Sequence, residues 1–215
     1  MNVVAISQRL IENERYPETR DCLDVRWASL FARLGLVPLV LPTAFDPSVY
    51  FERFSPTGLV LTGGNDLSSV SPSRLSAMRD AFERRLLDLA VARKVPVLGV
   101  CRGMQLVSDF FGSGVEKVAG HTAGATHSIT VAGASRFGAL LEGHASVRSY
   151  HDYGVTRLPE GFREVARSDD GVVEAIEHAA KPFAVAVQWH PEGMFKSDTH
   201  AQRIFEAFVA ACRER

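Results

Sequence analysis

Short apolar runs and amphipathic stretches alternate along the first half of the chain. The uninterrupted apolar runs, which predict buried strands, cover residues 3–7, 37–41, 58–61 and 95–100. Apolar residues at helical spacing predict helices over residues 23–34 and 75–89, and Ser71 followed by Pro72 is typical of the start of the second one. This rhythm favours an α/β fold whose parallel sheet carries helices on both faces.

The second half of the chain has a different pattern. Short strands are expected with little helix between them, and turns such as Asp170-Gly171 separate them, so we expect antiparallel pairs added to the main sheet. An amphipathic helix over residues 198–213 follows. Because we find no repeat, low-complexity tract or linker, a single domain over residues 1–215 is expected. The predicted strands of this half cover residues 129–131, 147–150, 162–166, 172–176 and 183–189.

Charge and cysteine content narrow the class of protein. The 24 basic residues nearly balance the 25 acidic ones, so no overall field attracts a nucleic acid polymer or an anionic membrane. No apolar run approaches the roughly 20 residues that span a bilayer, and the first residues lack the features of a signal peptide. Three widely spaced cysteines, Cys22, Cys101 and Cys212, are typical of a reduced protein. We therefore expect a cytoplasmic protein that does not bind membranes.

Cys101 lies at the point where the strand over residues 95–100 gives way to a helical pattern. Gly99 and Gly103 flank it closely, and a reactive side chain on such a strand-to-helix turn is the geometry of a nucleophile elbow. The amino terminus of the helix favours the thiolate over the thiol. The alternative is a buried cysteine that acts only as a small apolar side chain.

A cysteine nucleophile needs a base and a group that orients the base. His190 lies at the end of a predicted strand, and Glu192 follows it after one proline. Pro191 biases His190 towards an extended conformation, so the pair is a candidate for an oriented base. A surface turn with no catalytic role is the alternative.

The end of the third predicted strand carries two glycines, Gly63 and Gly64. Their backbone N–H groups can point into a cleft at close range, and the N–H groups of Gly64 and Arg102 are candidates for an oxyanion hole. An ordinary turn is the alternative. Thiolate, imidazole and backbone donors together fill the roles of a hydrolytic metal, so we expect neither a metal nor a cofactor. His121 and His127 are expected to lie in a solvated loop.

Three segments together resemble the signature of class I glutamine amidotransferases: Gly99-Val-Cys-Arg-Gly-Met-Gln105, residues 62–66 and residues 188–192. The Cys-Arg-Gly form, without a fused synthetase, is similar to the free-standing γ-glutamyl hydrolases of peptidase family C26. The resemblance implies a flavodoxin-like fold with a mostly parallel central sheet, flanked by helices, and an added antiparallel part. It also implies a Cys101–His190–Glu192 triad and a γ-glutamyl thioester on Cys101.

The same resemblance implies how the glutamyl head is held. Gln105 would contact it, and the segment Ser149, Tyr150 and His151 would line its pocket through backbone groups. Asn65, beside the two glycines, is a further candidate contact. The family more usually has asparagine where this chain has Arg148, so this wall of the pocket departs from the family pattern.

A narrower resemblance concerns the substrate. Residues 6–10, 20–23 and 63–67 are similar to the γ-glutamyl-CDP-amidate hydrolases of capsule phosphoramidate synthesis. This implies a small, nucleotide-linked γ-glutamyl substrate. Residues 7–24 are expected as a loop at the carboxyl edge of the sheet, where Arg9 and Arg20 are the candidate phosphate contacts. We expect a monomer or homodimer. Three alternatives remain open: a hydrolase of γ-glutamyl-GABA or another small γ-glutamyl amine, a glutaminase subunit that feeds ammonia to a synthetase, and a non-enzymatic member of the same fold. The arginines are otherwise a solvated face paired with Glu12, Glu14, Glu18 and Asp21.

Overall fold

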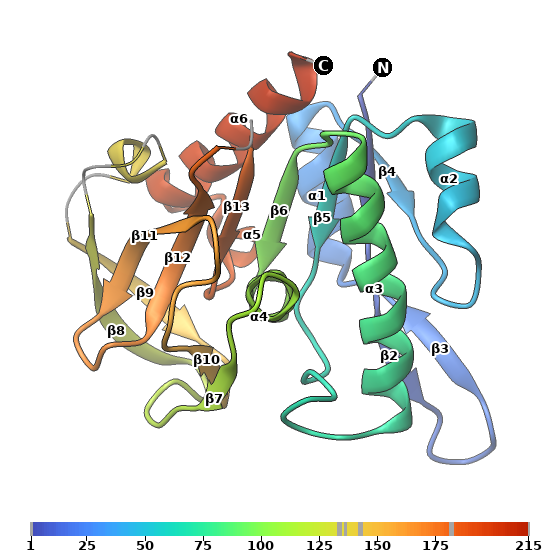
Figure 1. The fold of residues 1–215 in the computed structure, drawn as a ribbon, viewed down its shortest axis with the longest axis horizontal. Helices are drawn as coiled ribbons and strands as arrows, with labels where there is room; N and C mark the ends of the chain where they lie inside the picture. Colours follow the sequence, from blue (N-terminus) through green and yellow to red (C-terminus); the bar gives the residue numbers. More distant parts are fainter. Residues whose placement is uncertain (1, 133–134, 136, 142–143, 181–182, 215) are drawn as a thin grey trace.

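The apolar runs of the sequence form the parallel centre of one sheet in the computed structural model (Figure 1). The structure describes residues 2–132, 135, 137–141, 144–180 and 183–214. Neighbouring strands here run parallel. Apart from the edge strand over residues 37–40, their short apolar sequences are mostly buried, as expected for a sheet covered on both faces. Their order is β4 (Val37–Val40), β1 (Val3–Ile6), β5 (Gly58–Leu61), β6 (Val97–Val100) and β13 (Ala184–Val187).

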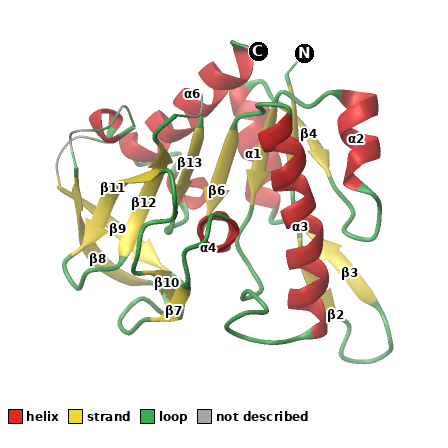
Figure 2. Cartoon of the chain, in the orientation of Figure 1, coloured by secondary structure: helices red, strands yellow, loops and turns green. Residues whose placement is uncertain are grey.

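Helices cover the two faces of this parallel part (Figures 1 and 2). On one face, Phe51, Leu86 and Met104 belong to a common buried core. On the other face, Trp27 and Phe205 pack edge to face with ring centroids 6.0 Å apart. The predicted α/β architecture is confirmed. The helices of the first face are α2 (Pro47–Phe54), α3 (Arg74–Ala92) and α4 (Arg102–Phe110); those of the second are α1 (Val25–Leu34) and α6 (Thr199–Arg213), beside the short α5 (Pro191–Met194).

The antiparallel addition continues the same sheet beyond β13. Its order is β13, β12 (Val173–His178), β11 (Phe162–Ser168), β8 (Ala125–Val131) and β9 (His144–Ser149). Strand β10 (Tyr153–Val155) joins β12 to β7 (Val115–Lys117), and a short 3-10 helix spans Gly138–Leu140. Strand β13 was expected among the antiparallel pairs, but it runs parallel to β6 and antiparallel to β12. Its carboxyl end therefore lies beside that of β6.

Two local predictions were wrong. Residues 7–24 were expected as a loop, but they contain a hairpin of β2 (Arg9–Glu12) and β3 (Thr19–Cys22), which has few apolar residues to announce it. Helix α3 is capped by Ser73 instead of Ser71, because the Ser73 hydroxyl accepts a hydrogen bond from the Ser76 N–H at 3.0 Å. Among the described residues, no helix combines the length and the apolar character that crossing a bilayer needs.

Candidate active site

Cys101 lies on a sharp turn between β6 and α4. Its φ of 54° is in the left-handed region, which side chains with a Cβ rarely adopt, and its N–H donates to the Val187 carbonyl at 2.8 Å. A Cβ on Gly103 would collide with the Leu61 carbonyl oxygen, and one on Gly99 would lie 2.9 Å from the Gly103 backbone. The two glycines thus allow α4 to start directly against the sheet, which gives the geometry of an elbow.

His190 and Glu192 follow β13 and lie beside this elbow. The Nδ1–H of His190 donates to Oε1 of Glu192 at 2.7 Å, and the Glu192 side chain is only 4% exposed. Burial lowers the pKa of His190, but hydrogen bonds and charge interactions with Cys101 and Glu192 outweigh it and raise that pKa to about 10. Gln188 Nε2 lies 3.8 Å from the Cys101 sulfur. The arrangement favours the protonated form of the His190 imidazole.

The glycine loop after β5 packs against this pair. A Cβ on Gly63 would lie 2.8 Å from Cε1 of His190 and 3.4 Å from Cβ of Cys101. Gly64 has a φ of +105°, and a Cβ there would lie 2.7 Å from the Arg9 side chain. Arg102 is the first residue of α4, so its N–H has no intrahelical partner. The N–H groups of Gly64 and Arg102 therefore remain candidate oxyanion donors. The loop at Gly63 and Gly64 has no room for a side chain at either position.

A buried cluster of charged side chains contacts the backbone of the glycine loop. We call Arg79, Asp80, Glu83 and Arg102 the arginine network. Arg79 donates to the carbonyls of residues 62 and 63 at 2.8 and 3.0 Å and to Glu83 at 3.0 Å. The Arg102 side chain pairs with both Glu83 and Asp80. Burial and the charge of Arg102 lower the pKa of Arg79 to about 10. Burial opposes ionisation of Glu83, but Arg102 and Arg79 outweigh it and lower its pKa.

Sequence reasoning missed most of the arginine network, although a signal for it was present. Arg79 and Glu83 are four residues apart on a helix whose apolar stripe includes Phe82 and Leu86. Two charged residues one turn apart on the buried side of a helix pair with each other or with a third charge. Reading α3 for charged residues inside its stripe would have found the pair.

A cavity of about 510 Å³ brings the candidate residues together. It opens at the carboxyl ends of the parallel strands, where ligands bind in open α/β sheets. Three charged residues that sequence reasoning did not place in the site, Arg26, Asp66 and Asp152, also line it. Burial, followed by the charge of Asp152, raises the pKa of Asp66. The predicted site residues in its wall are Arg9, Gly64, Asn65, Cys101, Arg102, Gln105, Tyr150, His151 and His190.

Other predicted contacts lie elsewhere or have different partners. Arg20 does not line the cavity: it lies nearer the turn of the hairpin than Arg9 and bonds to Glu18 at 2.8 Å. Ser149 is fully buried behind the cavity wall, with its hydroxyl 3.3 Å from Nδ1 of His127. The Asn65 amide binds both the N–H and the carbonyl of Leu10 at 2.9 Å. Asn65 therefore ties the glycine loop to β2.

In the wall around His151, two side chains donate to the same backbone carbonyl. Nε2 of Gln105 donates to the Tyr153 carbonyl at 2.7 Å, and Nδ1–H of His151 donates to the same oxygen at 2.9 Å. Burial lowers the pKa of His151 to about 4. The expectation that His121 and His127 lie in a solvated loop was wrong: His121 is 2% exposed, and its ring lies 4.9 Å from that of His151.

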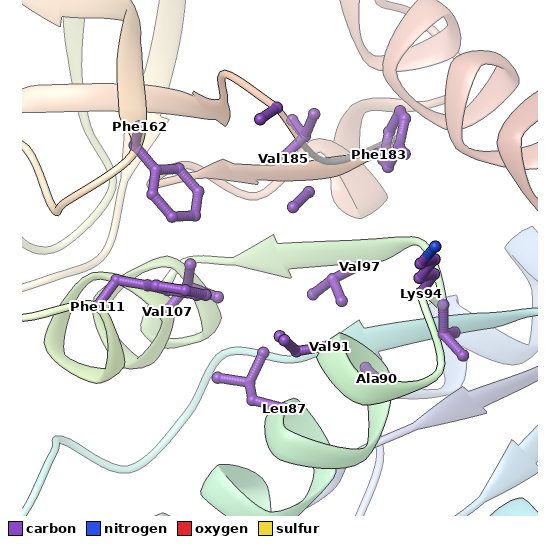
Figure 3. A pocket seen from close by; sticks show the side chains of 13 residues that line it. Leu87, Ala90, Val91, Lys94, Val97, Val107, Phe111, Phe162, Phe183 and Val185 are labelled. Carbon is purple, nitrogen blue, oxygen red and sulfur yellow. The ribbon is translucent and has the colours of Figure 1, made fainter.

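A second cavity, of about 340 Å³, lies at the amino ends of β6 and β13 (Figure 3). Figure 3 shows Leu87, Val97, Val107 and Val185 around it, with Lys94 at its edge. Apart from Lys94, the side chains in its wall are apolar, so this cavity has no candidate nucleophile. The candidate nucleophile Cys101 lies in the cavity at the other end of β6.

A sequence model of peptidase C26 matches residues 2–192 of the chain. The chain belongs to the peptidase C26 family. Among the relatives of this C26 member is the γ-glutamyl-CDP-amidate hydrolase of Campylobacter jejuni, which is 31% identical over 192 residues, 88% of this chain and 89% of that protein. The γ-glutamyl-γ-aminobutyrate hydrolase PuuD of Escherichia coli is 26% identical over 99% of this chain and 95% of its own length.

The C26 member also resembles a solved structure of a glutamine amidotransferase from Thermotoga maritima. The TM-score is 0.66 with 16% sequence identity, over 99% of this chain and 95% of that one. At this identity the likeness supports the fold alone. The family and its curated relatives assign the chain to the hydrolases.

Proposed function

We propose that the chain is a cysteine-dependent γ-glutamyl hydrolase that acts through a thioester on Cys101. The observation that carries this proposal is the grouping of Cys101, His190 and Glu192 beside a glycine loop. His190 is oriented by the Glu192 carboxylate at 2.7 Å. Burial lowers its pKa, but contacts with Cys101 and Glu192 outweigh burial and raise that pKa to about 10. An oriented base of this kind is the partner that a cysteine nucleophile needs.

The proposed reaction has two halves. The Cys101 thiolate adds to the γ-carbonyl carbon, and the carbonyl oxygen becomes negatively charged. The N–H groups of Gly64 and Arg102 donate hydrogen bonds to this oxygen. The C–N bond then breaks, His190 gives its proton to the leaving nitrogen, and the glutamyl group stays on sulfur. In the second half His190 takes a proton from water, the hydroxide attacks the thioester, and glutamate leaves as the thiolate re-forms.

The leaving group in this proposal is an anionic amidate linked to a nucleotide, as in γ-glutamyl-CDP-amidate. Arg9 and Arg26 both line the cavity with Cys101, and guanidinium groups suit the oxygens of a diphosphate. Asp66 and Asp152 supply the opposite charge, which matches the α-ammonium of the glutamyl group. The name of the Campylobacter relative supports the same substrate. The product would then serve capsular polysaccharide modification, as the resemblance of residues 6–10, 20–23 and 63–67 implies.

The test compares two arginines of the same hairpin. Arg9→Ala removes a charge from the cavity, whereas Arg20→Ala removes one outside it. Losing a charge-assisted contact costs about 1.5–3 kcal/mol, so we expect Arg9→Ala to reduce kcat/KM for γ-glutamyl-CDP-amidate about 10- to 100-fold. Arg20→Ala should leave it unchanged, and Arg9→Ala should barely affect a neutral γ-glutamyl anilide. Equal losses for both substrates would contradict the nucleotide assignment.

The mechanism is tested separately through Cys101. Cys101→Ala should abolish glutamate release from every γ-glutamyl amide while the fold is kept, and iodoacetamide should label Cys101 before Cys22 and Cys212. Retained turnover in the alanine variant would exclude the thioester.

A hydrolase of γ-glutamyl-γ-aminobutyrate is the second candidate, because the PuuD relative matches 99% of the chain. That substrate carries one carboxylate on its leaving group, which a single arginine can bind. The two arginines of the cavity favour the more highly charged diphosphate. A higher kcat/KM for γ-glutamyl-γ-aminobutyrate than for γ-glutamyl-CDP-amidate would reverse this order.

A further inference from the structure

Three polar side chains from distant parts of the sequence meet behind the wall of the Cys101 cavity; we call His121, His151 and Glu174 the histidine cluster. Their side chains are 2%, 3% and 0% exposed. One nitrogen of each ring and one carboxylate oxygen lie within 4.8 Å of one another. His121 Nδ1 is 3.4 Å and His151 Nε2 is 4.0 Å from Oε1 of Glu174.

Each of these three side chains has one buried atom without a hydrogen-bond partner among the described residues. The three atoms are Nδ1 of His121, Nε2 of His151 and Oε2 of Glu174. Buried polar atoms normally have a partner, because leaving one unpaired costs about 1–3 kcal/mol. Three such atoms, on side chains whose ligand atoms lie within 4.8 Å of one another, therefore indicate that a further group binds there.

The outward sides of both rings fix which nitrogen can act as a donor. His121 donates its Nε2–H to Asp170 at 2.9 Å, and His151 donates its Nδ1–H to the Tyr153 carbonyl at 2.9 Å. The remaining nitrogen of each neutral ring then presents a lone pair to the carboxylate. An imidazole held by a carboxylate or a carbonyl on its far side is the usual arrangement of a metal-binding histidine.

The carboxylate is oriented in the same manner. Nε2 of His127 lies 3.2 Å from Oε1 of Glu174, and the Ser149 hydroxyl lies 3.3 Å from the other nitrogen of that ring. A protonated His121 bridging Asp170 and Glu174 is an alternative account of part of this geometry. It would leave Nε2 of His151 and Oε2 of Glu174 unpaired, whereas a cation between the three groups satisfies all of them.

We propose that His121, His151 and Glu174 form a structural zinc site. Two imidazole nitrogens and a carboxylate are a donor set that zinc takes, with water in the fourth position. Zinc bonds of about 2.0–2.2 Å place tetrahedral ligands about 3.4 Å apart, so the observed 3.4 and 4.0 Å require only small movements. Calcium and magnesium prefer oxygen ligands, so the two nitrogen ligands disfavour them at this site.

The proposed zinc would stabilise a wall of the cavity without taking part in hydrolysis. His121 and Glu174 do not line the cavity, while His151 does, together with Tyr150 and Asp152 on either side of it. Zinc would thus connect β12 and the segment before β8 to the segment that faces the substrate. This inference does not depend on the identity of the substrate.

The experiment uses zinc itself as the probe. The full chain is stripped with a chelator, dialysed against zinc chloride and passed through gel filtration, and the retained zinc is measured by mass spectrometry. We expect one zinc per chain and a thermal unfolding midpoint several degrees above that of the stripped protein. A wild-type chain that retains no zinc would overturn the proposal.

Matched variants locate the ion. His121→Gln and Glu174→Gln should each lose the retained zinc, and Asp170→Asn, which only orients His121, should weaken zinc binding about 10- to 100-fold. His200→Ala, a histidine at the start of α6, should retain one zinc. Cys101→Ala should also retain it, which excludes binding at the Cys101–His190 pair.

Two results would count against this location. Loss of zinc in Cys101→Ala, or full retention in both His121→Gln and Glu174→Gln, would place the ion elsewhere. Near-ultraviolet circular dichroism of each stripped variant shows whether it is folded; if Glu174→Gln is not, His151→Gln replaces it as the ligand variant.

Discussion

Two buried charged clusters support opposite sides of the Cys101 cavity, and their polar atoms are satisfied to different degrees. In the arginine network, both carboxylate oxygens of Glu83 meet an arginine, and those of Asp80 meet Arg102 and Ser68. Among the described atoms of that network, Nε of Arg102 alone lacks a partner. In the histidine cluster three atoms lack one, one on each of three side chains whose ligand atoms lie within 4.8 Å of one another.

By this difference, the arginine network is a complete support, whereas the histidine cluster is the proposed binding site. A buried network whose charges are paired is rigid, because removing any member leaves an uncompensated charge. It holds the glycine loop through the carbonyls of residues 62 and 63. A cluster with converging unpaired atoms is complete only with an additional ligand. The loop side of the cavity is therefore fixed by the chain alone, and the wall around His151 would be completed by the proposed zinc.

The largest expected effect comes from breaking the arginine network. Glu83→Gln leaves Arg79 and Arg102 with one buried carboxylate between them, so we expect a loss of about 3–5 kcal/mol in the free energy of unfolding. Urea denaturation of the stripped protein measures it. Asp88→Asn, an exposed acid on the same helix, is the control and should change stability very little. Similar stability of both variants would show that the network is dispensable.

A smaller effect should separate the two clusters. With free zinc at 100 times its Kd, the wild type should gain about 2.7 kcal/mol in unfolding free energy. Glu83→Gln should keep this gain and Glu174→Gln should lose it, because the clusters share no residue. Denaturation curves with and without zinc check this. If Glu83→Gln also lost the gain, the clusters would be coupled and the comparison above would fail.

The acid limb of the stability curve should reflect the arginine network. The pKa of Glu83 is lowered below its usual 4.5, because the arginines outweigh burial. Its contribution to stability is therefore present above pH 4.5 and is lost as the pH falls through its folded value. We expect Glu83→Gln to show a shallower decline than the wild type below pH 4.5. Parallel declines would assign the acid sensitivity to other carboxyl groups.

The smallest expected effect concerns the protonation of His190. Its pKa is raised to about 10 against burial by Cys101 and Glu192, so its contribution to stability is complete below pH 6.5 and is lost as the pH rises towards 10. In Cys101→Ala the His190 pKa should fall, because the thiolate is gone. NMR titration of the imidazole measures both values. An unchanged pKa in Cys101→Ala would contradict the ion pair.

The sequence predicted what is encoded in short segments. Apolar runs identified the strands of the parallel centre, and residues 99–105 and 188–192 each place their candidate groups within a few positions. How these two segments lie relative to each other could be seen only in the structure, because β6 and β13 are distant in the sequence and pair in parallel.

The histidine cluster could not be predicted in the same way. His121, His151 and Glu174 come from three segments, and no spacing in the sequence links them. The two histidines stand among mostly polar residues, whereas Glu174 lies inside the apolar strand predicted over residues 172–176. The β2–β3 hairpin escaped prediction for a related reason: its strands are held mainly by backbone pairing, and Leu10 is their one deeply buried apolar residue. Arg20 was therefore placed in the site, although it lies nearer the turn of the hairpin, beside Glu18.

The backbone at Cys101 implies that selection for reactivity acts against stability at this position. A φ of 54° in a residue with a Cβ costs about 1–2 kcal/mol, which a glycine would not incur. Cys101→Gly should therefore be more stable than Cys101→Ala, and more stable than the wild type wherever relief of strain exceeds the lost contacts of the thiol. Libraries selected only for thermal stability should accumulate glycine at residue 101, whereas selection for turnover should restore cysteine.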